Sequence, residues 1–375
     1  MTPRVLVDAT AIPADRGGVG RYVDELLPAL GRAGADLVVV CQERDAEQTS
    51  ALVPSAEVVT APVAIARRPA RLAWEQVGLP QVVRRTRADV LHSPHYTMPA
   101  RAGVPVVTTL HDATFFSHPT LHGGLKARFF RRAIRGAVRR SASLVVPSEA
   151  TRDEVLRYAG GTAARFHVAY HGVDRSVFHP VSVQERERVT TTLGLAQGEA
   201  YVGFLGTLEP RKNVPALVRG WVQAVGDVPS PPALVLAGGA GWDEDIEPAI
   251  AAVPPHLRVI RTGYLPLTDL AGFLAASTVL AYPSHGEGFG LPVLEAMACG
   301  AAVLTTRELS LPEVGGDAVA YCGTTEHEIG AALRDLLQDE ERRRTLGDAA
   351  ARRAALFTWD TAAEVHLRAY AAAAG

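Results

Sequence analysis

Short apolar runs rich in β-branched residues alternate along the chain with longer segments in which apolar residues recur every three or four positions. The short runs predict strands and the longer segments predict amphipathic helices, an alternation typical of parallel sheets covered by helices. The fold class is therefore α/β, with two Rossmann-like series. Strands are expected at 4–8, 37–41, 58–63, 89–92, 104–110, 144–146 and 166–170, and then at 201–205, 233–236, 257–261, 278–282, 301–305 and 318–321.

The two series are separated by a polar stretch without a strand pattern, residues 179–197. A change of this kind marks a domain boundary, and we expect the hinge near residues 173–181. At about 150 residues per domain, a chain of 375 residues is long enough for two separate cores. The sequence predicts a first lobe at 1–175 and a second lobe at 176–357.

Composition narrows the class of protein. Apolar residues make up 47% of the chain and charged residues 21%, with a formal net charge of −2, which describes a globular protein and gives no sign of a nucleic-acid partner. Cys41, Cys299 and Cys322 lie far apart without a C-x-x-C pair, so neither a disulfide framework nor a zinc site is expected. No leader-like segment and no run of about 18 apolar residues occurs, which predicts a cytoplasmic protein without a transmembrane segment.

The loop after the first expected strand, residues 15–22, contains Gly17, Gly18 and Gly20 and leads into a helical pattern. Glycines at such a turn allow backbone N–H groups to approach a phosphate at the positive end of a helix. The spacing is not the G-x-G-x-x-G dinucleotide fingerprint, and the chain has no P-loop motif. A phosphate-binding loop and a plain strand-to-helix turn both fit these residues.

Arg211 and Lys212 follow the first strand of the second series and precede a helical pattern. Ligands of parallel sheets bind at the carboxyl ends of strands, so adjacent cations at this place are suited to a diphosphate. A solvated surface pair is the alternative, and the position after a strand favours the binding role.

The most informative segment is residues 285–300. Glu287 lies in a glycine-rich turn, Pro292 suits the first turn of a helix, and Glu295 falls about one turn inside that helix. Two carboxylates thus bracket a helix N-terminus, where N–H groups can hold phosphates and carboxylates can accept hydrogen bonds from sugar hydroxyls. Donor-binding residues are expected in this turn at Gly288, Phe289, Gly290 and Leu291.

Glu287 and Glu295, with seven residues between them, resemble the E-x7-E pattern of family 4 of the retaining glycosyltransferases, which have the GT-B fold. Further stations of that family occur in the same order at residues 17–20, 111–112, 148–151, 171–174, 206–207, 211–213 and 238–242. The resemblance covers nearly the whole chain. It implies two Rossmann-like lobes with parallel sheets facing a cleft, and a closing helix at 358–375 that crosses back onto the first lobe.

The same resemblance implies residue roles. In the family the glycine loop approaches the donor phosphates, the Arg-Lys pair binds the diphosphate, the first glutamate reaches hydroxyls of the transferred sugar and the second binds the ribose. Carried onto this chain, the donor-binding residues outside the 288–291 turn are Gly17, Gly18, Arg211, Lys212 and Glu295. The implied catalytic residues are Glu287, Arg211, Lys212 and His111.

His111 and Asp112 directly follow an expected strand of the first lobe, so we expect them in the cleft near the sugar. A histidine at a strand end is often a structural residue, but its match to a family station favours the functional role. His92, His95 and Tyr96 end the preceding strand and are expected to shape the acceptor pocket.

No H-x-x-x-H helix or carboxylate cluster predicts a metal site. The string Asp243-Glu244-Asp245 has the D-x-D form that holds a divalent metal in single-lobed transferases. We interpret it as a surface loop that caps the helix expected at 246–252, because Arg211 and Lys212 supply the charge that D-x-D enzymes obtain from a metal. Neither a metal nor another cofactor is therefore expected.

Residues 126–140 combine seven basic side chains with an apolar stripe. Such a segment fits a helix lying on anionic lipid, as a lipid-linked acceptor would require, and equally a helix packed on the sheet with a solvated outer face. Packing alone is the simpler interpretation. A peripheral position at the inner face of the membrane stays as an alternative to a plain cytoplasmic one.

Together with the resemblance, the sequence predicts a retaining, metal-independent glycosyltransferase. It moves a hexose from a nucleotide diphosphate sugar to a glycan, a lipid-linked or a small-molecule acceptor. Segments 206–213 and 309–316 look most like mannosyltransferases that use GDP-mannose, so mannose is the first candidate. The alternatives are a nucleotide-sugar 2-epimerase and a non-catalytic nucleotide-sugar-binding protein.

Overall fold

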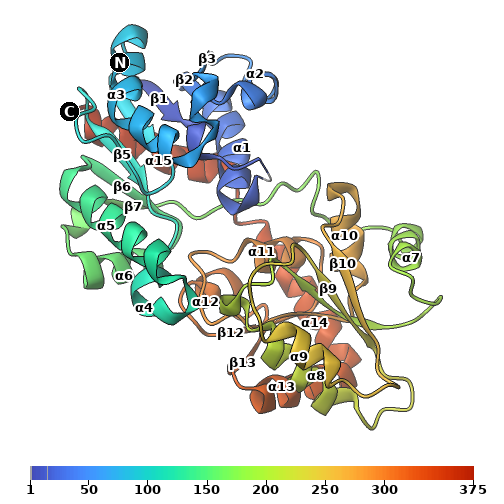
Figure 1. Cartoon of the computed structure of the whole chain (residues 1–375). Coiled ribbons are helices and arrows are strands. Elements are labelled where there is room, and N and C mark those ends of the chain that lie inside the picture. Colours follow the sequence, from blue (N-terminus) through green and yellow to red (C-terminus); the bar gives the residue numbers. More distant parts are fainter. Residues whose placement is uncertain (1, 15) are drawn as a thin grey trace. The chain divides into compact units, whose positions relative to one another are not determined.

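The computed structural model describes residues 2–14 and 16–375, so Asp15, the first residue of the expected glycine loop, lies outside the description. The chain forms two compact units (Figure 1). The first contains the chain up to Gly172 together with Thr358–Gly375, and the second is Val173–Phe357. The sequence predicts the corresponding boundaries at 175/176 and 357/358.

Within the described residues, the first unit contains a seven-stranded parallel sheet of order β3-β2-β1-β4-β5-β6-β7. Both faces of this sheet are buried, as parallel sheets require. Val5 and Val7 join the core beneath one layer of helices, while Leu6 joins the core on the other face. The strands are β1 (Arg4–Asp8), β2 (Asp36–Cys41), β3 (Glu57–Thr60), β4 (Val90–Ser93), β5 (Val106–Thr109), β6 (Ser143–Val146) and β7 (Phe166–Val168).

The helices of the first unit cover both faces. Residues of α1 and α15 pack in the core that holds Val5, and residues of α3 and α5 in the core that holds Leu6. The α-helices are α1 (Gly17–Arg32), α2 (Ala46–Leu52), α3 (Arg68–Thr86), α4 (Thr114–Ser117), α5 (Gly124–Arg140), α6 (Glu149–Ala159) and α15 (Trp359–Ala374). Short 3-10 turns are η1 (Ala9–Ala11), η2 (Glu43–Asp45), η3 (Val63–Ala66), η4 (Pro119–Leu121) and η5 (Ala163–Arg165).

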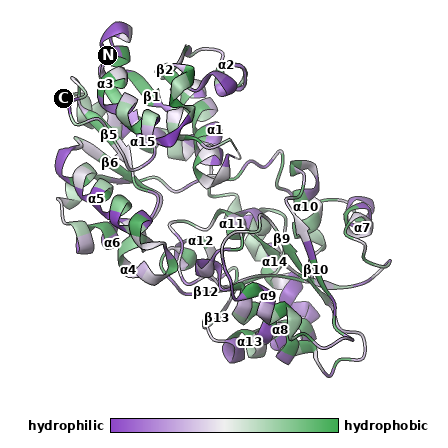
Figure 2. Cartoon of the chain, viewed as in Figure 1, coloured by the Kyte–Doolittle hydropathy of each residue, from purple (hydrophilic) through white to green (hydrophobic). Residues whose placement is uncertain are grey.

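In the described residues the second unit contains a six-stranded parallel sheet of order β10-β9-β8-β11-β12-β13 around one core. Figure 2 shows β9 as hydrophobic and α7 as mostly hydrophilic. The strands are β8 (Tyr201–Leu205), β9 (Ala233–Ala237), β10 (Val259–Gly263), β11 (Val279–Tyr282), β12 (Val303–Thr306) and β13 (Ala320–Cys322). The helices are α7 (Val183–Thr192), α8 (Val214–Val225), α9 (Ile246–Ala251), α10 (Leu267–Ala276), α11 (Leu291–Ala298), α12 (Leu311–Gly315), α13 (Glu326–Gln338), α14 (Glu340–Ala354) and the 3-10 turn η6 (Pro210–Lys212).

The α/β fold class is confirmed, and each expected strand has a counterpart, although several ends differ. The strand expected at 58–63 stops at Thr60, since Pro62 has no N–H to continue the ladder. The strand expected at 104–110 begins only at Val106, directly after Pro105. Residues 179–197, expected without a strand, contain α7.

Both sheets reverse their strand order at one point, between β1 and β4 in the first unit and between β8 and β11 in the second. Ligands of open parallel sheets bind at the carboxyl edge beside such a reversal, because the loops after the two central strands diverge there. The loops that follow β1, β4, β8 and β11 are therefore the places to examine for a site.

Candidate functional site

In the second unit, the loops after β8 and β11 are joined by hydrogen bonds at the reversal point. The main-chain N–H of His285 donates to the carbonyl of Arg211 over 2.9 Å, and the Arg211 guanidinium donates to the carbonyl of Gly286 over 2.7 Å. Asn213, in a left-handed conformation with φ 59°, donates from its side chain to the carbonyls of Pro283 and Thr324. The cationic loop and the glycine-rich turn are thereby held as one structure.

At the centre of this structure is the carboxylate of Glu287, which is only 7% exposed. Its Oε2 pairs with Arg211, and its Oε1 accepts from the Lys212 ammonium at 2.6 Å. Two hydroxyls also bond to this carboxylate. Tyr282, at the end of β11, donates to Oε1 over 3.0 Å, and Ser284, just after the strand, donates to it over 2.8 Å. Arg211, Lys212 and Glu287, expected from the sequence as one site, thus meet directly.

The electrostatics of this cluster favour an ionised carboxylate. Burial by itself would raise the pKa of Glu287, but the charges of Arg211 and Lys212 outweigh burial and lower the pKa to about 2. Burial lowers the pKa of Lys212, and the charge of Glu287 opposes that effect. A second carboxylate, Glu209, lies 3.7 Å from Arg211, so two cations and two anions balance here.

The glycine-rich turn leads into α11, with Gly290 at the N-cap and φ 101°. A side chain at Gly290 would be strained and would place Cβ only 2.9 Å from Leu311. Ser310, fully buried on the next loop, lies 2.8 Å from the carbonyl of Glu287 and 2.9 Å from that of Phe289. The loop after β12 therefore holds the glycine-rich turn in shape through Ser310.

The remaining residues of the second unit that the sequence predicts to bind the donor lie in or near this turn. Gly288 is part of it, Leu291 is the first residue of α11, and the ring of Phe289 is buried edge-to-face against Phe357 at 5.9 Å. Glu295 lies on α11 and is 1% exposed. Burial and the Glu295 charge together raise the pKa of the Cys299 thiol to about 12.

In the first unit, His92 is placed in a fully buried chain of hydrogen bonds. His366 Nδ1 lies 2.7 Å from a main-chain carbonyl of α15, which can only accept, so its Nε2 accepts from the Tyr22 hydroxyl at 2.7 Å. Tyr22 then accepts from Thr109 at 3.0 Å, Thr109 accepts from His92 Nε2 at 2.9 Å, and His92 Nδ1 accepts from Tyr370 at 2.9 Å. Each member of the chain is neutral and satisfied.

The other expected acceptor-pocket residues lie together after β4 and β5. His111 Nε2 donates to the carbonyl of Pro94 over 2.7 Å, and its ring packs against those of Tyr96 and His95 at 5.8 and 6.4 Å. Asp112 donates from its main-chain N–H to the Tyr96 hydroxyl over 3.1 Å. The structure therefore brings these four residues together, and the Tyr22 ring, 4.9 Å from that of His111, connects them to the chain that contains His92.

Burial gives these histidines neutral rings. Burial lowers the pKa of His111, while its bond to Pro94 and the charge of Asp112 oppose that shift. Burial, with the nearby His111, lowers the pKa of His95 to about 3. Tyr96 has φ 55°, and a non-glycine residue in this region stores strain that clusters at functional sites.

The glycine loop begins α1 directly. Gly17 is the first residue of the helix, with φ 51°, and both it and Gly18 are exposed. Arg16, also in a positive-φ conformation, is held by ion pairs with Asp24 and Asp45. Exposed glycines at the N-terminus of a long helix leave backbone N–H groups open to an anion.

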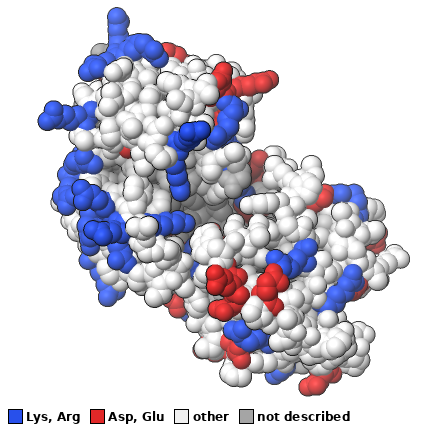
Figure 3. Space-filling view, viewed as in Figure 1, with Lys and Arg blue, Asp and Glu red and all other residues white. Residues whose placement is uncertain are grey.

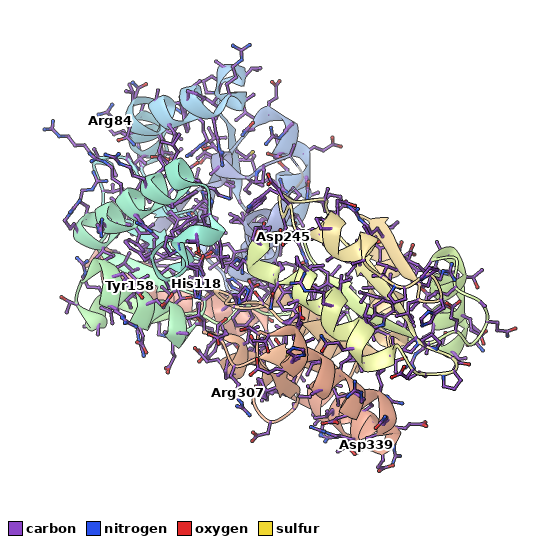
Figure 4. The ribbon with its side chains drawn as sticks, turned by 60° about the horizontal axis from the view of Figure 1, so that its bottom comes forward. Arg84, His118, Tyr158, Asp245, Arg307 and Asp339 are labelled. Carbon is purple, nitrogen blue, oxygen red and sulfur yellow. The ribbon has the colours of Figure 1, made fainter. Side chains whose placement is uncertain are left out.

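The D-x-D string does not cap α9 in the expected way. Asp245 occupies the N-cap position without a side-chain capping bond, and Asp243 instead accepts from the Asp245 main-chain N–H at 3.1 Å (Figure 4). The Asp243 side chain therefore closes a turn ahead of α9 and does not cap the helix. Among the described residues no group of three or more His, Cys, Asp and Glu side chains is arranged to hold a metal ion.

Sequence reasoning missed several polar partners of the expected residues. Tyr282, Ser284 and Ser310 surround Glu287, and Thr109 and Tyr370 bond to His92. Tyr282 ends β11 and Ser284 lies just after it, before the glycine-rich turn, and that position was a usable signal. The partners of His92 come from β5 and α15, and no sequence spacing links them.

Comparison with known proteins agrees with this geometry. The model of "Glycosyltransferase Family 4" matches residues 16–177, and that of "Glycosyl transferases group 1" matches residues 185–353. The O-antigen chain mannosyltransferase B of Escherichia coli is 30% identical over 304 residues, which cover 80% of this chain and 77% of that protein. The D-inositol 3-phosphate glycosyltransferase of Kineococcus radiotolerans is 28% identical over 405 residues, covering 95% and 90%.

Among solved structures, Anabaena HepE in complex with UDP-glucose superposes with a TM-score of 0.75 at 19% identity, covering 97% of this chain and 98% of that one. At this identity the likeness concerns the fold. Two parallel sheets in two units, the site after β8 and β11 and these matches define a glycosyltransferase with the GT-B fold. The chain belongs to glycosyltransferase family 4.

Proposed function

We propose that the protein is a retaining, metal-independent hexosyltransferase, with mannose from GDP-mannose as the first donor to test. The observation that carries the proposal is the placement of Arg211 and Lys212 beside the glycine-rich turn at the reversal point of the second sheet. The mannosyltransferase relative supports mannose, while the structural neighbour with UDP-glucose supports only a nucleotide-sugar donor.

The catalytic proposal follows from the ion cluster. A donor diphosphate takes over Arg211 and Lys212, which stabilise the charge that develops as it leaves. Glu287, released from part of its cation contacts, then accepts hydrogen bonds from the sugar, and the family resemblance assigns orientation of the sugar to His111. Because the two cations supply the positive charge, no divalent metal has a necessary task in this scheme.

A lipid-linked acceptor is supported by the outer face of α5. Its 17 residues include seven cations and no carboxylate, and Figure 3 shows cations gathered on this side of the first unit. Phe130, Ile134 and Val138 are buried against the sheet, whereas Leu125 and Phe129 are 88% and 42% exposed. Exposed apolar side chains among cations fit an anionic membrane surface and the phosphate of a lipid-linked sugar. No helix in the described part of the chain is long and apolar enough to cross a membrane.

The function is tested by measuring nucleotide release from GDP-mannose, UDP-glucose and other donors, with and without EDTA, followed by the anomeric configuration of the product. We expect release from one donor, little effect of chelation and an α-linked product from an α-linked donor. Activity that manganese restores after chelation would return Asp243 and Asp245 as metal ligands, and an inverted product would contradict the retaining mechanism.

The two alternatives differ in the same assay. A 2-epimerase would release free nucleotide and a 2-epimer without any acceptor, and a binding module would bind the donor and release nothing.

The membrane proposal is tested by sedimentation with anionic vesicles. Sedimentation of the protein should fall as salt is added, and the double variant Leu125→Ser with Phe129→Ser should sediment less. Equal sedimentation with neutral and anionic vesicles would leave α5 only its packing role.

A further inference from the structure

We propose that Tyr282 is a positioning residue of the donor site, whose hydroxyl holds the Lys212 ammonium and the Glu287 carboxylate in one arrangement. The inference rests on the proposed function, in which Lys212 binds the donor diphosphate. None of the sequence motifs includes Tyr282, and its role follows from its contacts.

The ring and backbone of Tyr282 are fixed by the sheet and not by the ion cluster. Tyr282 is the last residue of β11 and is fully buried. Its ring stacks on that of Phe204 from β8, with centroids 5.8 Å apart and planes 14° from parallel. Its carbonyl accepts from the Thr305 hydroxyl on β12 at 2.9 Å. The hydroxyl is thus held at a defined point by two neighbouring strands.

That hydroxyl makes two contacts of different kinds. It donates to Glu287 Oε1 over 3.0 Å, and it contacts the Lys212 ammonium. Since the single proton of the hydroxyl goes to the carboxylate, its oxygen accepts from Lys212. The ammonium also lies 4.8 Å from the centroid of the Tyr282 ring. Replacement by phenylalanine would keep the stacked ring and remove only this bridge.

The bridge matters because Lys212 is buried. Its charge is supported by Glu287 and Glu209 and opposed by Arg211, and burial lowers the pKa of Lys212 from its ordinary value. Without the Tyr282 oxygen the ammonium loses an acceptor where water cannot replace it, so the pKa of Lys212 falls further. The form that binds diphosphate is the ammonium. Without the Tyr282 hydroxyl, Lys212 therefore loses its proton at a lower pH than in the wild type.

The experiment compares wild type, Tyr282→Phe and Tyr201→Phe as full-length proteins. Tyr201 is the matched control, because it is equally buried in the same sheet and its hydroxyl donates to the carbonyl of Phe273, outside the site. The kcat/KM for nucleotide release is measured across the neutral and alkaline range. For Tyr282→Phe we expect a loss of about tenfold near neutral pH and an alkaline limb shifted about one pH unit lower, with the limb of Tyr201→Phe unchanged.

Two outcomes count against the inference and are distinguishable. An active wild type whose alkaline limb superposes on that of Tyr282→Phe would overturn the role of Tyr282 alone. Absence of nucleotide release from wild type with every donor would overturn the proposed function and the inference with it. Calorimetric titration with GDP and UDP gives a readout that does not depend on turnover, in which Tyr282→Phe should bind more weakly than Tyr201→Phe.

Discussion

The two sheets have the same strand order through their first six strands, yet the polar groups at their reversal points are arranged differently. In the second unit the loops after β8 and β11 enclose ionised groups, Arg211, Lys212 and Glu287. In the first unit β4 carries His92 of the neutral chain, while Asp8 at the end of β1 lies 3.9 Å from Arg71 of α3, which also pairs with Glu75. One topology therefore supports two kinds of polar interior.

This difference indicates which kind of ligand group each unit can accept. Buried charges are stable only when paired, and a pair that exchanges one partner for a ligand anion stays balanced. A neutral chain in which each donor has one acceptor is rigid and has no charge to offer. On the proposed function we therefore expect the second unit to exchange Glu287 for a donor anion. In the first unit the neutral chain supports His111, whose ring lies 4.9 Å from that of Tyr22.

The largest expected effect comes from removing a charge in the second unit. Arg211→Ala and Lys212→Ala should each lower kcat/KM by about 100-fold or more, because each removes a charge-assisted contact to the leaving diphosphate. Removing one partner of a buried pair also lowers the free energy of unfolding, by about 3–5 kcal/mol. Nucleotide release and thermal unfolding are measured for both variants.

The control for this charge removal is Arg219→Ala. Arg219 forms an exposed ion pair with Glu326 on the same unit, so the same change of charge should cost little in activity or stability. Near-wild-type kcat/KM for both site variants would mean that the ion cluster stabilises the fold without serving the reaction.

Much of the fold was predictable because it depends on local patterns. The thirteen apolar runs predicted as strands all have a counterpart among the described strands. Two of these strands are shorter than predicted because of Pro62 and Pro105, which are visible in the sequence. The common location of Arg211 and Glu287 was predictable as well, since both follow central strands whose carboxyl ends must converge.

What the sequence did not predict depends on contacts between distant segments. Tyr22 and His366 are 344 residues apart and share a hydrogen bond, and no pattern in either segment indicates it. The neutralisation of Arg211 and Lys212 by Glu287 was not expected either, since the resemblance assigns the carboxylate to the sugar. Burial decides that pairing, and burial of a side chain is a property of the folded structure.

The second prediction is that the two units lose stability at different acidic pH values. Burial and neighbouring histidines lower the pKa of His366 to about 4, even though its bond to a main-chain carbonyl opposes that shift. An unfolded histidine titrates near 6.5, so as the pH falls from about 6.5 to 4 the unfolded chain takes up a proton that the folded unit refuses. His366 alone should therefore cost the first unit up to about 3 kcal/mol in this window. For Glu287, whose folded pKa of about 2 lies below the unfolded value, stability is lost only below about pH 4.5.

Hydrogen exchange of α15 and α11 at several pH values measures this difference, after correction for intrinsic rates. Near pH 5 we expect α15 to lose protection while α11 keeps it. His366→Gln removes one titrating group and should make the dependence of α15 between pH 6.5 and 4 shallower, with the remainder coming from other buried histidines such as His95 and His111. Equal loss in both helices would show that acid unfolds the chain through groups outside these two clusters.

The smallest expected effect concerns Gly18 in the first unit, to which the family resemblance assigns an approach to the donor phosphates. A Cβ built at Gly18 meets nothing within 4 Å, so Gly18→Ala should leave the free energy of unfolding unchanged or raise it by about 0.5 kcal/mol. If backbone N–H groups there contact the diphosphate, the added methyl group holds it away, and kcat/KM should fall about tenfold. Gly20→Ala is the contrasting variant, since its Cβ would lie 2.8 Å from Cβ of Arg16 and should destabilise the fold. Unchanged kcat/KM in a stable Gly18→Ala protein would remove the glycine loop from the donor site and leave the anion to the second unit alone.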